Sequence, residues 1–292
     1  MPADDDNTPK CAACGKGGDG LKICNGCKLV NYCNATCQMA HRPRHKKLCK
    51  KRAAELKDEA LFKEPPPVED CPICCLPIPI NAGVKEQYQS CCGKILCMGC
   101  LYAIEAEDIR MLCPFCRTPG PTSHAELIER LKNRADADDA EAIHVLGCDY
   151  YYGEMGVQQD YKKGIELCLR AGELGCVRAY GNVAQIYDEG KGVEKDEKKA
   201  THYWELAAMG GGVFSRHNLG VWEAYAGNID RAVKHWMISA VAGCDDSLEE
   251  IRQCFLRGHA TKDDFETAQR AHKKAKDETR SDQRDAAATA AE

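Results

Sequence analysis

Paired cysteines are the residues of this chain whose type and spacing could do chemistry. Sixteen of its 21 cysteines lie between residues 11 and 116, mostly two or three residues apart. A Cys-x-x-Cys pair supplies two thiolates from one turn, which is half of a tetrahedral zinc site. A module of about forty residues buries too little apolar surface to fold alone, and bound zinc supplies the missing stability. The spacing therefore predicts metal centres rather than ordinary buried thiols.

The first cluster offers seven cysteines and one histidine, enough ligands for two zinc ions. In order they are Cys11, Cys14, Cys24, Cys27, Cys33, Cys37, His45 and Cys49. Spacing alone leaves both interleaved and sequential pairing open. In each of the last two pairs, Cys33 with Cys37 and His45 with Cys49, the two residues are four positions apart, which places both on one face of a helix.

This order, with Tyr32 before Cys33 and Gln38 after Cys37, resembles a MYND-type zinc finger over residues 11–49. The resemblance implies interleaved binding and selects His45 rather than His41 as the ligand. Such fingers usually have Trp where this chain has Arg42, on the surface that they use for proline-rich peptides. The implied sets are Cys11, Cys14, Cys33 and Cys37 for one zinc, and Cys24, Cys27, His45 and Cys49 for the other.

The second cluster resembles a RING-type finger over residues 71–117. This segment holds nine cysteines and no histidine, and Lys94 stands where a RING usually has His, so the resemblance is to the all-Cys variants. The resemblance implies two interleaved sites, with adjacent cysteines as third and fourth ligands and Cys75 as the spare. The sets are Cys71, Cys74, Cys97 and Cys100 for one zinc, and Cys91, Cys92, Cys113 and Cys116 for the other. Together the two modules are expected to hold four Zn²⁺ ions.

Three further residues match the positions by which RING ubiquitin ligases engage the E2 conjugating enzyme and its ubiquitin. They are Ile73 between the first two cysteines, Pro114 after the seventh, and Arg117 after the eighth. The alternative is that Ile73 and Pro114 only shape the zinc-binding turns and that Arg117 is solvated.

From about Ala135 the chain repeats itself every 36 or 37 residues. The segment Leu146-Gly147-x-x-Tyr150-x-x-Gly153 matches Val183-Ala184-x-x-Tyr187-x-x-Gly190, and a looser third copy follows from Leu219. Such a period predicts stacked helix pairs. We expect Asp160 and Asp196 to cap second helices, and Thr261 to cap the last helix of a degenerate fourth unit. The pattern resembles Sel1-like, tetratricopeptide-type repeats over residues 137–275. The five cysteines here are interpreted as core residues.

The predicted fold class is two small zinc-stapled modules of short β plus α, followed by an all-α Sel1-like solenoid. The expected parts are a disordered acidic N-terminus (1–10), the MYND-type finger (11–49), a helix and Pro-rich linker (50–70), the RING-type finger (71–117), a linker helix (118–136), the repeats (137–275) and a disordered tail (276–292).

Composition narrows the class of protein. The net charge is −5, no run approaches the ~18 apolar residues of a membrane span, and acidic residues 4–6 stand where a signal peptide is basic. We expect an intracellular protein, cytoplasmic or nuclear, with reduced cysteines and no membrane contact. The basic segment 42–57 could bind nucleic acid, but a solvated helix face is the commoner meaning of such a run.

Two functions fit these motifs. The first is a RING-type E3 ubiquitin ligase that recruits an E2 through the second module and substrate through the repeats. Such a ligase has no catalytic side chain of its own and acts by orienting its partners. The second is a non-enzymatic adaptor in which all three parts are protein-docking surfaces.

Overall fold

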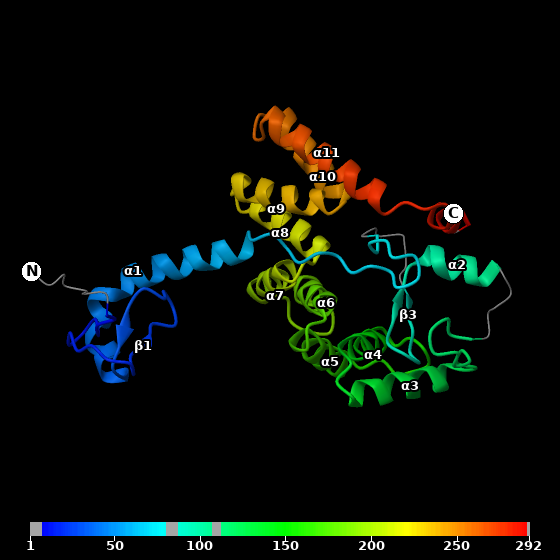
Figure 1. Cartoon of the computed structure of the whole chain (residues 1–292), viewed down its shortest axis with the longest axis horizontal. Helices are drawn as coiled ribbons and strands as arrows, with labels where there is room; N and C mark the ends of the chain where they lie inside the picture. Colours follow the sequence, from blue (N-terminus) through cyan, green and yellow to red (C-terminus); the bar gives the residue numbers. More distant parts are fainter. Residues whose placement is uncertain (1–7, 80–86, 107–111, 291–292) are drawn as a thin grey trace, which may run out of the picture. The chain divides into compact units, whose positions relative to one another are not determined.

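The computed structural model describes residues 8–79, 87–106 and 112–290, and it divides into two units, Met1–Lys63 and Glu64–Glu292 (Figure 1). The predicted fold class is confirmed: cysteine-rich modules with two-residue strands precede an all-α solenoid. Most of the acidic N-terminus, residues 1–7, lies outside the described residues. Among the helices that are described, we find none with the length and apolar character of a membrane span.

The first unit consists of a small hairpin and one long helix. Strand β1 (Lys22–Ile23) pairs antiparallel with β2 (Asn31–Tyr32), and α1 runs over Ala35–Leu61. The helix begins where the Asn34 side chain accepts a hydrogen bond from the backbone N–H of Cys37 at 3.0 Å.

Helix α1 runs across the boundary expected at residue 50 between the finger and the linker helix. The finger and the charged segment form one continuous helix, because residues 50–61 are rich in strong helix formers such as Ala, Leu, Lys and Glu. Within it Arg52 donates to Glu59 at 2.7 Å and to Glu55 at 3.2 Å, which is typical of a solvated helix face.

In the second unit, residues 71–117 form a cysteine-rich module, called here the second zinc module. It contains strands β3 (Gln87–Tyr88) and β4 (Ile95–Leu96), paired antiparallel, and helix α2 (Met98–Ala106). Helix α3 (His124–Asp136) follows, and it begins at Ser123, whose hydroxyl accepts from the backbone of Glu126.

In the described part of the second unit, residues 140–278 form four helix pairs. The pairs are α4 (Ala140–Tyr152) with α5 (Tyr161–Glu173), α6 (Val177–Glu189) with α7 (Glu197–Met209), α8 (Val213–Tyr225) with α9 (Ile229–Val241), and α10 (Asp245–Leu256) with α11 (Lys262–Glu278). The expected caps Asp160, Asp196 and Thr261 are confirmed, and the fourth pair confirms the degenerate fourth unit. A glycine is required at Gly164, since a Cβ there would lie 2.7 Å from the Cβ of Tyr151 on the partner helix.

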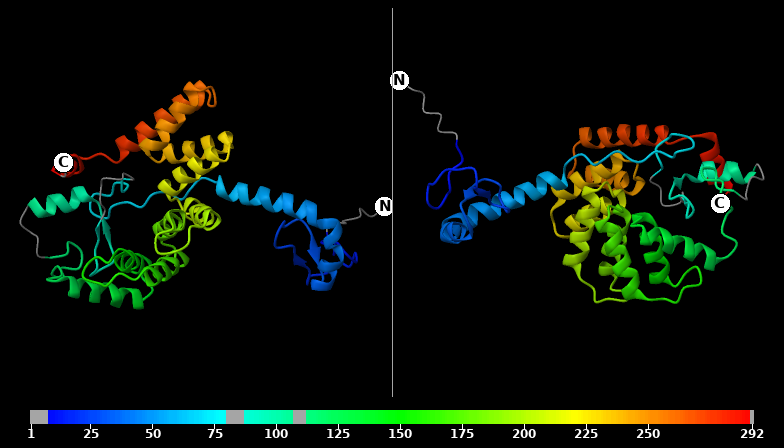
Figure 2. Two further views of the ribbon diagram at one scale, coloured as in Figure 1. Left: turned by 180° about the vertical axis from the view of Figure 1, so that it is seen from behind. Right: turned by 60° about the horizontal axis from the view of Figure 1, so that its bottom comes forward.

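The C-terminal segment is helical, so its expected disorder is wrong for the described residues up to 290. Helix α11 extends to Glu278, and α12 covers Asp282–Ala290. The physical reason is a docking contact that composition does not reveal: Arg284 is only 7% exposed, and its backbone packs against Gly99 of α2. Both views in Figure 2 show the red C-terminal helix beside α2.

The second zinc module contacts the first helix pair of the solenoid and helix α12, which follows its last pair. At one end, the Tyr88 hydroxyl donates to Asp139, the N-cap of α4, at 2.8 Å and accepts from Arg134 of α3 at 2.6 Å. At the other end, Arg284 of α12 donates to the carbonyl of Pro77 at 2.7 Å and to the Cys74 sulfur at 3.2 Å.

Candidate metal centres

Four Cys-x-x-Cys turns of the described residues share one backbone geometry. Each ends one residue after its second cysteine, where a residue with φ between 54° and 75° donates its N–H to the carbonyl of the first cysteine. The pairs are Gly15 with Cys11 at 2.8 Å, Lys28 with Cys24 at 3.0 Å, Cys75 with Cys71 at 2.8 Å, and Arg117 with Cys113 at 3.0 Å. Sequence reasoning missed this feature, because only Gly15 is a residue type that favours a left-handed backbone.

In the first unit, the structure brings together the two expected ligand sets. They are Cys11, Cys14, Cys33 and Cys37, and Cys24, Cys27, His45 and Cys49, and within each set the candidate ligand atoms all lie within 4.8 Å of one another. The Sγ atoms of Cys14 and Cys33 are 3.5 Å apart, and Cys27 Sγ lies 3.3 Å from His45 Nε2. The other histidine of the finger, His41, instead lies beside Tyr32, with its Nδ1 3.0 Å from the Tyr32 hydroxyl oxygen.

In the second unit, the structure also brings together both expected four-cysteine sets. They are Cys71, Cys74, Cys97 and Cys100, and Cys91, Cys92, Cys113 and Cys116. The Sγ atoms of Cys71 and Cys100 are 3.8 Å apart, as are those of Cys74 and Cys97, and Cys92 and Cys113 are 3.6 Å apart. The expected spare, Cys75, is exposed and lies outside both sets.

These separations fit zinc rather than disulfide bonds. Four thiolates placed tetrahedrally at about 2.3 Å from Zn²⁺ are about 3.8 Å from one another. A disulfide would require about 2.05 Å between the two sulfur atoms. The sulfur pairs of the clusters, at 3.5–3.8 Å, match the first distance and exclude the second.

Each of the four sets contains one thiol with a pKa lowered to about 6, namely Cys11, Cys24, Cys71 and Cys116. Burial raises the pKa of the first three, but backbone N–H groups of the turns donate to their sulfur atoms and outweigh it. At Cys116 the main cause is the Thr118 side chain, 3.1 Å away. One thiolate in each set is thereby favoured before any metal binds, and the thiolate is the form that ligates zinc.

The three candidate E2-binding residues lie on the Cys-x-x-Cys turns of the second zinc module. Ile73 is 39% exposed, Pro114 is half-buried and Arg117 is exposed. Two more apolar side chains of the same segment, Leu112 and Phe115, are 41% and 37% exposed. An apolar surface on these turns is what a protein-docking site requires.

Comparison with known proteins identifies two parts of the chain. Residues 11–49 match the MYND finger family, and residues 140–176 and 177–212 each match the Sel1 repeat. The chain carries a MYND finger and Sel1 repeats. It therefore combines a zinc-binding finger with a repeat scaffold of the kind that mediates protein–protein interaction. The matched residues do not include 71–117, so the RING-type interpretation stays a prediction.

Individual relatives cover the chain only in part. It is 27% identical over 106 residues, or 36% of its length, to the Arabidopsis thaliana ERAD-associated E3 ubiquitin-protein ligase component HRD3B, and it spans 16% of that protein. Among solved structures, a Sel1 repeat protein from Oxalobacter formigenes has a TM-score of 0.48 at 24% identity, covering 62% of this chain and 71% of that one. A protective antigen of uropathogenic Escherichia coli with an SLR fold has a TM-score of 0.47 at 23% identity, covering 55% and 35%.

Proposed function

We propose that this protein is a RING-type E3 ubiquitin ligase that holds four structural Zn²⁺ ions, two in the MYND finger and two in the second zinc module. The observation that carries the proposal is the interleaved arrangement of residues 71–117. Ligands from the first and third pairs form one set, and those from the second and fourth pairs form the other. Zinc would join segments far apart in sequence and fix the two exposed turns.

The module would act by orientation. Ile73, Pro114 and Arg117 would contact an E2 that carries ubiquitin as a thioester, so that a substrate lysine attacks it in a favourable geometry. The similarity to a plant protein named as an E3 ligase component supports a role in ubiquitination, although the chain spans only 16% of that protein.

The repeats would hold the substrate in a cavity of about 890 Å³ within the second unit. Its lining includes the apolar Trp204 and Phe214, the polar Asn182 and Gln185, and segment 66–69. Such a mixed lining suits an extended peptide, whose backbone needs hydrogen-bond partners and whose side chains need apolar contacts.

Autoubiquitination with purified E1 and a panel of E2 enzymes tests the ligase. We expect product with the wild type, and at least a tenfold loss with Ile73→Ala at unchanged zinc content by native mass spectrometry. Leu256→Ala, which truncates a 62% exposed side chain of the solenoid, is the matched control and should retain full activity.

Absence of product across the panel, with folded and zinc-loaded protein, would refute the ligase and favour the non-enzymatic adaptor. Fewer than four zinc ions per chain would refute the proposed ligand sets independently of activity.

A further inference from the structure

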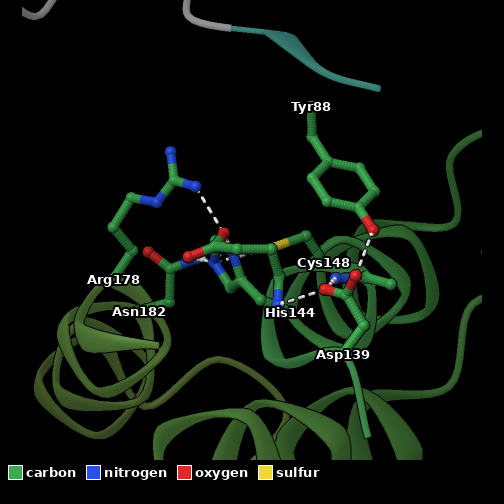
Figure 3. Close-up of polar contacts among 8 residues, drawn as sticks. Tyr88, Asp139, His144, Cys148, Arg178 and Asn182 are labelled. Atoms are coloured by element: carbon green, nitrogen blue, oxygen red, sulfur yellow. Dashed lines mark hydrogen bonds and ion pairs between the residues drawn. The ribbon is translucent and has the colours of Figure 1, made fainter. Parts of the chain in front are cut away.

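A fifth cluster of metal-ligating side chains lies in the solenoid, outside both zinc modules. It consists of Glu141 and His144 on α4 and Cys176 at the start of α6, and one ligand atom from each lies within 4.8 Å of the others. Figure 3 shows its surroundings, where Arg178 and Asn182 of α6 face His144 and Cys148 of α4.

The helix starts position these three residues. Glu141 lies in the first turn of α4, and His144 follows three residues later on the same face. Cys176 is the N-cap of α6, and its side chain makes no capping hydrogen bond, whereas Asp139 caps α4 in the equivalent place. Cys176 is buried, with 3% of its surface exposed.

The imidazole of His144 is held on one side only. Its side chain is 12% exposed, and Nε2 lies 3.0 Å from Asn182 Nδ2 and 3.5 Å from Cys148 Sγ. Nδ1 is buried and has no hydrogen-bond partner in the described chain, with Glu141 Oε2 at 3.8 Å. A buried ring nitrogen without a partner costs free energy, which a bound cation would recover.

The surroundings match those of a metal ligand set. In such sites the second nitrogen of a ligating histidine usually donates its N–H to a neighbouring acceptor, as Nε2–H can donate here to Cys148 Sγ at 3.5 Å, and ligating carboxylates are themselves hydrogen-bonded. Glu141 satisfies the second condition through its ion pair with Arg178.

We propose that Glu141, His144 and Cys176 bind one further divalent cation of the zinc class. A set of one oxygen, one nitrogen and one sulfur ligand suits Zn²⁺, whereas Mg²⁺ and Ca²⁺ prefer oxygen ligands alone. Three protein ligands leave a fourth position open, as in zinc sites that exchange their last ligand.

The open position points to the class of ligand that the ion would take. Glu141 and His144 both line the cavity of about 890 Å³. The fourth ligand would be water or a carboxylate or imidazole group of a peptide in that cavity. The ion would also connect α4 with α6 and so link the first two repeats.

Counting bound zinc in the full-length protein by native mass spectrometry tests this site. We expect His144→Ala and Cys176→Ser each to carry one ion fewer than the wild type. The matched control is Cys244→Ser, because Cys244 is also a buried N-cap cysteine, at α10, with no capping bond and no place in a ligand cluster of the described residues. Its ion count should equal that of the wild type. Because the test is a difference between variants, it stands whether or not the zinc modules hold four ions.

Glu141→Gln keeps the size of the side chain, so it still tests the metal site if the other two variants lose helicity. We expect it to weaken binding of the additional zinc ion at least about tenfold in competition with a chromophoric chelator. Equal ion counts in the wild type and in folded His144→Ala and Cys176→Ser would overturn the proposal. So would unchanged zinc affinity in Glu141→Gln. Either result would leave the cluster as a metal-free Cys148–His144 pair.

Discussion

Replacing Arg284 by Ala should release the C-terminal helix from the second zinc module. The Arg284 guanidinium donates to the carbonyls of Pro77 at 2.7 Å and Leu76 at 3.2 Å, and to Cys74 Sγ at 3.2 Å. A fourth bond, to the carbonyl of Thr279 at 2.7 Å, stays within the C-terminal segment. Three of the four bonds therefore hold α12 on the module.

The expected loss follows from these three bonds. A hydrogen bond with a charged donor contributes about 1.5–3 kcal/mol, and the cost of burying the guanidinium offsets part of the sum. We therefore expect docking of α12 to weaken by about 2–4 kcal/mol. A helix of nine residues is unstable in isolation, so its protection against exchange depends on this contact.

Hydrogen–deuterium exchange with mass spectrometry measures this opening directly. Exchange of residues 282–290 should accelerate about 30- to 700-fold, since 1.4 kcal/mol corresponds to a factor of ten. The matched control is Arg280→Ala, because the Arg280 side chain is 70% exposed and pairs with Asp285 at 2.9 Å. An exposed pair contributes at most about 1 kcal/mol, or about fivefold. Unchanged exchange in Arg284→Ala, or equal effects of the two variants, would refute the reasoning.

Three more perturbations follow from single contacts. Gly164→Ala places a Cβ 2.7 Å from that of Tyr151 and should destabilise the solenoid by about 1–3 kcal/mol, seen as a lower Tm. Burial raises the pKa of Asp149 to about 6, so the native state binds more protons than the unfolded chain between about pH 4 and 6, and the free energy of unfolding falls as pH rises through this window. Asp149→Asn should therefore stabilise the protein at pH 7 by about 1–2 kcal/mol in urea titrations, and the gain should vanish below about pH 4. Tyr88→Phe removes the hydroxyl between Arg134 and Asp139 and should weaken the β3–β4 contact with the solenoid by about 1–2 kcal/mol, measured as faster amide exchange in both strands.

Local patterns of the sequence predicted the features that arise locally. The order and spacing of the cysteines marked the candidate ligands, and the resemblance to MYND and RING fingers, rather than spacing alone, implied the interleaved sets that the structure brings together, Cys91 and Cys92 included. Capping residues such as Asp160 and Thr261 predicted helix starts, because a side chain that caps a helix acts within a few residues.

Contacts between distant segments could not be predicted in the same way. Arg284 lies more than two hundred residues from its partners, and a polar, Ala-rich tail gives no periodic signal for docking. Cys176 belongs to a repeat whose other small residues fill the core, so its proximity to His144 appears only when α4 and α6 are stacked. The left-handed backbone at Arg117 is set by the turn around it and is not encoded in its side chain.

A stack of helix pairs ordinarily has two independent ends, and each can fray without disturbing the other. Here Tyr88 contacts the N-cap of the first pair, Arg284 of α12 follows the last pair, and both residues bind within the cysteine-rich segment 71–117. The chain in this unit is therefore closed on itself without a covalent crosslink. Its ends cannot separate unless one of these contacts breaks, so we expect loss of the zinc ions proposed for segment 71–117 to release both contacts together.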